Sequence, residues 1–239
     1  MTRTAPQPPS APAPGERGDT NGEDITSLPD TPLARAALSL AVGAEPASIA
    51  NHSIRSYLFA RLVARTLGMA AGRDHDERLL LLACVLHDLG LAPEGEHFQR
   101  FEVVGADRAA EFLTAQGLPA AEVDAVWEAI ALHTTPQIAE RRGALSLLLR
   151  EGICVDFGGV IGPGTVPDAV TEEEARAIHE AYPRLSMVSS IVEAMATQAA
   201  RHPANGPRYS VGGELLRERG NPPRRTRMEE AALSSRWGS

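Results

Sequence analysis

The chain has 239 residues, of which 43% are hydrophobic and 23% charged, and its formal net charge is −8. These values are typical of one sizeable globular domain, and the acidic balance argues against nucleic-acid or anionic-membrane binding. All 23 basic residues are arginine, and the absence of lysine excludes Schiff-base, pyridoxal-phosphate and Walker-type ATPase chemistry. We therefore expect a small molecule as the partner, with a homo-oligomeric state left open.

Residues 1–26 carry five prolines and few large apolar side chains, which predicts a disordered leader. Asp30, Thr31 and Pro32 then form a helix start, because a capping side chain is followed by proline in the first turn. Apolar spacing and glycine or proline breaks mark the later elements. The predicted helices cover residues 32–44, 50–67, 77–90 (capped by Asp74 or Asp76), 104–116, 120–133, 144–157, 171–182 and 186–201.

Strand-like alternation is scarce, so the pattern predicts an all-α bundle of seven or eight helices. The bundle is expected to occupy residues 27–206. Residues 207–239 are rich in arginine and poor in aromatic side chains, and we interpret them as a tail without the role of a lid.

The two cysteines bear on the cellular location of the protein. Cys84 and Cys154 lie in apolar runs and form no Cys-x-x-Cys pair. Such thiols are expected to be buried and reduced, which favours a cytoplasmic protein. No apolar run reaches the ~18 residues needed to cross a bilayer, and the N-terminus lacks the hydrophobic segment of a secretory signal.

An ionisable pair, His87 and Asp88, ends the most apolar predicted helix. A buried carboxylate without a partner costs several kcal/mol, so we expect a bound metal or an ionic partner there. His52, His133 and Asp156 also stand at the ends of apolar helical runs. Together these side chains predict a site of two or three nitrogens and two oxygens, suited to zinc, iron or manganese. Three other histidines, His75, His179 and His202, are interpreted as surface or helix-end residues.

The order His52, His87-Asp88 and Asp156 resembles the HD-domain superfamily of metal-dependent hydrolases. Four blocks resemble its cyanamide hydratase-like branch more narrowly. They are NHSIRSY (51–57), ACVLHDLG (83–90), RFEVVGAD (100–107) and WEAIALHT (127–134).

This resemblance implies an HD-domain helical fold and a divalent metal, with Zn²⁺ first and Fe²⁺ or Mn²⁺ as alternatives. The implied metal ligands are His52, His87, Asp88 and Asp156. His133 is expected to face the substrate and to share the catalytic role with Asp88. Arg55 and Glu102 are expected to orient ligands or substrate around them.

The implied reaction is the addition of metal-activated water to a small electrophile, such as the hydration of cyanamide to urea. A phosphohydrolase is the first alternative, and Arg55 and Arg100 would then have to bind the phosphate. A di-iron oxygenase would need His97 and His133 as additional ligands. A sensor module that keeps the metal for structure is the alternative outside the enzymes.

Overall fold

The computed structural model describes residues 24–92, 98–159, 169–220 and 225–238. Within these ranges the chain is all helical, without a named strand, which confirms the predicted fold class. Its α-helices are α1 (Pro32–Ala44), α2 (Ala47–Thr66), α3 (Glu77–Leu86), α4 (Phe101–Ala115), α5 (Ala120–Leu132), α6 (Ala144–Asp156), α7 (Glu172–Ala181), α8 (Met187–Arg201), α9 (Val211–Arg219) and α10 (Arg227–Leu233), with short 3-10 turns η1 (Leu89–Leu91) and η2 (Ala139–Arg141).

Local signals account for most helix starts. The Thr31 hydroxyl accepts a hydrogen bond from the Ala34 N–H at the start of α1, and Asp76 caps α3 in the same manner. Helices α2 and α4 each begin three residues before the predicted start, and the largest difference is at α3, which ends at Leu86 rather than at Gly90. Asp88 has φ −97° and ψ 7°, a turn conformation outside the α-helix. The His87-Asp88 pair therefore follows α3 instead of lying in it.

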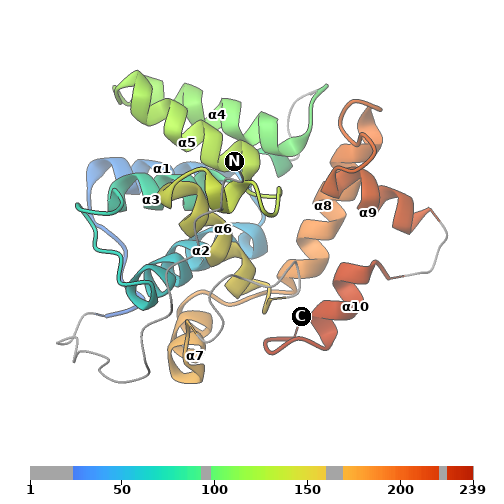
Figure 1. Cartoon of the computed structure of the whole chain (residues 1–239). Coiled ribbons are helices and arrows are strands. Elements are labelled where there is room, and N and C mark those ends of the chain that lie inside the picture. Colours follow the sequence, from blue (N-terminus) through green and yellow to red (C-terminus); the bar gives the residue numbers. More distant parts are fainter. Residues whose placement is uncertain (1–23, 93–97, 160–168, 221–224, 239) are drawn as a thin grey trace, which may run out of the picture.

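The long helix α2 lies at the centre of the molecule and packs on α3 and α6. Figure 1 shows α4 and α5 on one side of this centre and α8, α9 and α10 on the other. Nearly every side chain of α2 from Ser48 to Ala64 is buried, including the polar ones. A helix buried all round leaves its polar residues to bind each other or a ligand.

The segment after residue 206 differs from the predicted tail, because it contains α9 and α10. Helix α9 packs against α8, and the Ser210 side chain caps its first turn. Thr226 and Glu229 form a reciprocal capping box at α10. The Trp237 indole N–H then donates to the Val155 carbonyl at 3.0 Å. The C-terminal segment is thus part of the packed structure. The expected leader, residues 1–26, lies almost wholly outside the described residues, and none of the described helices is long and apolar enough to cross a membrane.

Gly152 sets the closest approach between α6 and α2, because a Cβ at this position would lie 2.1 Å from the Ser56 carbonyl oxygen. We predict that Gly152→Ala lowers the free energy of unfolding by about 1–3 kcal/mol or more, since backbone must move to admit the methyl group. Urea unfolding measures the change. Gly43→Ala in α1 is the matched control: a Cβ there meets nothing within 4 Å, and the helix gains up to about 1 kcal/mol. Equal stability of the Gly152→Ala and parent proteins would contradict the packing.

Candidate metal centre

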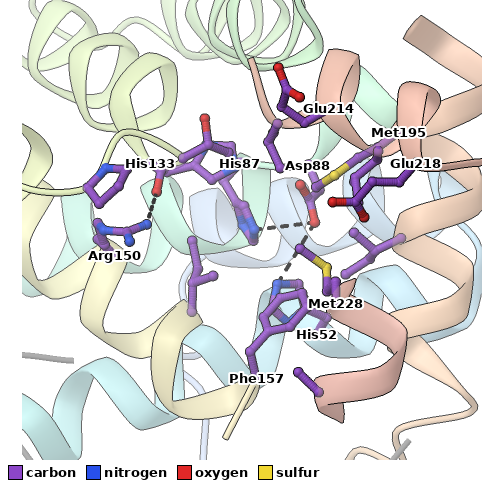
Figure 2. A pocket seen from close by; sticks show the side chains of 17 residues that line it. His52, His87, Asp88, His133, Arg150, Phe157, Met195, Glu214, Glu218 and Met228 are labelled. Atoms are coloured by element: carbon purple, nitrogen blue, oxygen red, sulfur yellow. Dashed lines mark hydrogen bonds and ion pairs between the residues drawn. The ribbon is translucent and has the colours of Figure 1, made fainter. Parts of the chain in front are cut away.

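Three buried side chains from two segments converge at one point. His52 comes from α2, and His87 and Asp88 follow α3; one ligand atom of each lies within 4.8 Å of the others. The Asp88 Oδ2 atom is 3.3 Å from His87 Nε2 and 4.0 Å from His52 Nε2. All three side chains are at most 2% exposed. Figure 2 shows the three side chains directed toward one another at the edge of a cavity.

Hydrogen bonds fix which nitrogen of each imidazole is available. His87 Nδ1 lies 2.7 Å from the Cys84 carbonyl oxygen, which can only accept, so Nδ1 carries the proton. His52 Nδ1 donates in the same way to Asp156 Oδ2 at 2.6 Å. Both Nε2 atoms therefore present lone pairs toward Asp88, which is the arrangement of metal-binding histidines. Two imidazole nitrogens and a carboxylate oxygen fit a divalent transition metal.

The electrostatics of the group also favour a cation. Burial alone would raise the pKa of Asp88, but His87 and His52 hold it well below its ordinary value. Burial conversely lowers the pKa of His87, and the adjacent Asp88 more than offsets this, so that the pKa of His87 is raised. Asp88 thus keeps its negative charge inside the protein. A metal ion can take the place of the proton that this charge attracts.

Asp156, expected as a fourth ligand, lies behind His52 rather than among the converging atoms. Arg55 Nε and Nη2 donate to its two oxygens, each at 2.8 Å, and His52 shares Oδ2. Burial raises the pKa of Asp156, but Arg55 and its other donors hold it well below the usual range. This geometry does not support direct ligation by Asp156. It places the carboxylate where it orients His52.

The two expected orienting residues occupy different positions. Arg55 is fully buried, and its Nη1 also donates to the Tyr182 carbonyl at 3.0 Å, so it reaches the metal site only through Asp156 and His52. Glu102 on α4 accepts hydrogen bonds from Arg100 and Thr134, which hold its pKa below the ordinary value against the effect of burial. Glu102 therefore holds the side chain of Thr134, the residue that follows His133.

His133 caps the end of α5, and its ring centroid lies 5.0 Å from that of His87. Its Nδ1 donates to the Ile130 carbonyl at 2.6 Å, which leaves a lone pair on Nε2. Burial and the neighbouring His87 lower the pKa of His133 to about 4. At neutral pH the ring is uncharged and can accept a proton at Nε2, as a general base does.

The three converging side chains and His133 line a cavity of about 550 Å³. Its wall also comes from α6, α8, α9 and α10. The lining residues are His52, His87, Asp88, His133, Thr134, Pro136, Arg150, Ile153, Phe157, Ile191, Met195, Val211, Glu214, Leu215, Glu218, Met228 and Ala231. The contribution of α9 and α10 was missed from the sequence, although the Thr226-x-x-Glu229 capping signal was available there.

Two histidine interpretations are wrong. His75 was expected in solvent, but its side chain is 3% exposed and its Nε2 lies 3.0 Å from Glu77 Oε2. His179 was expected at the surface, but its Nε2 lies 3.5 Å from Asp156 Oδ1 and its ring packs edge-on against Phe59 and Trp237. His97, the additional ligand that a di-iron site would need, lies outside the described residues.

Comparison with known proteins agrees with this geometry. Residues 49–157 match the model of the HD domain family. This stretch of the chain is similar to an HD domain. It is also 26% identical over 182 residues to two cyanamide hydratases of Saccharomyces cerevisiae, DDI2 and DDI3, a match that covers 75% of this chain and 78% of each yeast protein. The resemblance inferred from the sequence is confirmed, and it supports a metal-dependent HD-domain enzyme.

The structure separates ligands from the residue that orients them. We predict that His52→Ala, His87→Ala and Asp88→Ala each remove bound metal from protein loaded with Zn²⁺ and freed of excess by gel filtration. Asp156→Asn should instead retain metal with an affinity about 10–100-fold weaker, the usual effect of losing an outer partner. Elemental analysis and competition with a chelator measure both effects.

His202→Ala is the control, because His202 contacts Ala204 and Phe98 at the end of α8 and should keep full metal content. If Asp156→Asn keeps the circular dichroism spectrum of the folded parent and still loses metal as completely as Asp88→Ala, then Asp156 is a ligand and not the residue that orients His52.

Glu45 introduces a pH dependence. Its carboxylate is 6% exposed, has no hydrogen-bond partner among the described residues, and has a pKa raised well above its ordinary value by burial and by Asp88. From about pH 4 upward the unfolded chain releases a proton that the folded protein keeps, so stability falls as pH rises toward the raised pKa.

We predict that Glu45→Gln removes this loss in metal-free protein. Relative to the parent, the free energy of unfolding of the variant should rise by on the order of 1 kcal/mol or more as the pH increases from about 5 to about 8. Urea unfolding at several pH values measures the difference. Glu173→Gln, on the exposed face of α7, is the control that should follow the parent. Parallel pH curves for Glu45→Gln and the parent would refute the prediction.

Proposed function

We propose that this HD-domain protein is a metal-dependent hydratase that adds water to a small nitrile-like electrophile, with cyanamide to urea as the reference reaction. The observation that carries the proposal is His133: a buried, uncharged imidazole with a free Nε2 beside the candidate ligand His87, on the wall of a cavity. The similarity to two yeast proteins named cyanamide hydratases supports the choice of electrophile. A cytoplasmic location and a small-molecule partner are part of the same proposal.

His52, His87 and Asp88 would hold the metal, for which Zn²⁺ is the first choice and Fe²⁺ or Mn²⁺ the alternatives. Such an ion supplies Lewis acidity, which makes water a nucleophile at neutral pH. The hydrogen bonds at both Nδ1 atoms keep the ligand rings in place and in the required tautomer. The chain would therefore hold both ligand rings rigidly, because the Nδ1 atom of each ring, which would not face the metal, is hydrogen-bonded.

His133 would move the proton. Its Nε2 accepts a proton from the attacking water and passes it to the substrate nitrogen, while the water oxygen bonds to the nitrile carbon and a carbon–nitrogen π bond breaks. A second proton shift, from that oxygen to the nitrogen, gives the amide. One water is consumed, and no oxidant or further reactant is needed. A low pKa keeps His133 unprotonated at neutral pH, so the ring holds the proton only briefly before the substrate nitrogen takes it.

The charges in the cavity disfavour the phosphohydrolase alternative. Arg55 and Arg100, which would have to bind the phosphate, are not among the lining residues and are paired with Asp156 and Glu102. Arg150 is the one arginine in the described lining, and its side chain is hydrogen-bonded to Glu140. Carboxylates outnumber this cation along the wall, which repels a phosphate ester.

The proposal is tested with protein loaded separately with Zn²⁺, Fe²⁺ and Mn²⁺. Each form is incubated with cyanamide, small nitriles, nucleotides and p-nitrophenyl phosphate, and urea, amide and phosphate are measured. We expect urea or amide with at least one metal and no phosphate above background. Phosphate release without urea or amide would favour the phosphohydrolase. Retained metal with no turnover on any compound would favour the sensor module.

We predict that His133→Ala lowers kcat about 10²–10⁴-fold, the usual contribution of a positioned acid or base. Its metal content should equal that of the parent, because His133 is not among the three converging ligands. Steady-state kinetics with elemental analysis of the same preparation measure both quantities. His202→Ala should keep full activity. Unchanged kcat in His133→Ala would exclude the proton transfer assigned to this residue.

A further inference from the structure

We propose that the natural substrate is not cyanamide itself but a larger amphipathic molecule. Besides the nitrile-like group it would carry an apolar body and a cationic group, such as an ammonium. The reacting end of this inference rests on the proposed function. The apolar and cationic parts rest on the cavity alone.

The size of the cavity is the first argument. Its volume of about 550 Å³ lies within the range of roughly 300–1,000 Å³ found for pockets that enclose drug-sized ligands. Cyanamide is comparable to a few water molecules, each of which occupies about 30 Å³ in the liquid. It would leave most of this space filled by solvent. A cavity of this size is suited to a ligand with many more atoms.

The chemistry of the wall is the second argument. Beyond the metal group, the cavity is lined by Ile191, Met195, Leu215 and Met228 from α8, α9 and α10, and by Ile153 and Phe157 at the end of α6. Figure 2 shows Met195, Met228 and Phe157 around this space. A small polar electrophile gains nothing from these side chains, whereas an apolar body buries surface against them. The two methionines suit a ligand of irregular shape, because their side chains are flexible and polarizable.

The charge that α9 contributes to the wall is the third argument. Glu214 and Glu218 are four residues apart on α9, and both line the cavity. Glu214 is half exposed and pairs with Arg217, and it also accepts a hydrogen bond from the Tyr209 N–H at 2.9 Å. Arg150 is the one arginine in the described lining, and its charge is paired with Glu140. This wall attracts an ammonium group and repels a carboxylate.

The test uses three benzonitriles that differ mainly in charge: 4-(aminomethyl)benzonitrile, 4-ethylbenzonitrile and 4-cyanobenzoate. Their binding to the metal-loaded protein is measured by calorimetry, and their hydration by amide formation, with cyanamide as reference. We expect the ammonium compound to bind about tenfold or more tighter than the carboxylate and to exceed cyanamide in kcat/KM. Glu214→Gln/Glu218→Gln should reduce the advantage of the ammonium compound over the ethyl compound to about one, while Glu173→Gln leaves it unchanged.

Binding and turnover separate the two proposals. If cyanamide is hydrated but the carboxylate binds as tightly as the ammonium compound, or no benzonitrile binds, the inference is overturned and the proposed function stands. If the ammonium compound binds selectively, the double variant abolishes this selectivity and no compound is hydrated, the ligand class is upheld and the hydratase function fails.

Discussion

A fully buried ion pair, Arg55 with Asp156, joins the central helix α2 to the end of α6 behind His52. Removing two charges from water is costly, and only a complete set of hydrogen bonds makes such a pair tolerable. That set is present. Both carboxylate oxygens of Asp156 accept hydrogen bonds from Arg55, and Oδ2 also accepts one from His52 Nδ1. The remaining Arg55 nitrogen, Nη1, donates to the Tyr182 carbonyl. Gly152 allows the same two helices to approach closely. The packing of α2 on α6 and the orientation of His52 therefore depend on one interaction.

The same principle recurs at each imidazole of the site. His52, His87 and His133 all donate from Nδ1 to an acceptor 2.6–2.7 Å away, and all three are buried. The acceptor differs in a manner that matters: a carboxylate holds His52, whereas backbone carbonyls hold His87 and His133. A carbonyl fixes the tautomer without adding charge, and the neighbouring groups decide the pKa. Burial lowers the pKa of both His133 and His52, whereas Asp88 outweighs burial at His87 and raises its pKa. Two candidate ligands and a candidate base thus differ in their surroundings although they are one residue type.

Sequence patterns predicted what is encoded locally. The caps at Thr31 and Thr171 and the apolar runs gave eight helices near their observed positions. The converging set His52, His87 and Asp88 was also anticipated, because ionisable residues in apolar runs need a partner. Asp156 shows the limit of this reasoning: the sequence marks it as a buried acid but does not reveal that Arg55, far along the chain, occupies its oxygens.

The other differences also arise from tertiary contacts. Helices α9 and α10 are short and rich in charge, and such segments are stabilised mainly by packing against the rest of the protein, here α8. His179 lies on a helix with three acidic residues in its first turn, which suggested exposure. It stands four residues after Ala175, however, and residues four apart share a helix face. Ala175 is fully buried, so the spacing held the information that the composition concealed.

The position of the HD match along the chain separates the reaction from its specificity. His52, His87, Asp88, His133 and Asp156 all fall within residues 49–157, the part that matches the family. The apolar and acidic wall from α8, α9 and α10 lies entirely beyond residue 157. A family match over the first part therefore carries information about the metal and the proton acceptor. It carries little about what fills the rest of the cavity, because those side chains belong to helices outside the match. Substrate choice in this chain is accordingly expected to depend on residues 187–231, whereas the reaction type depends on residues 49–157.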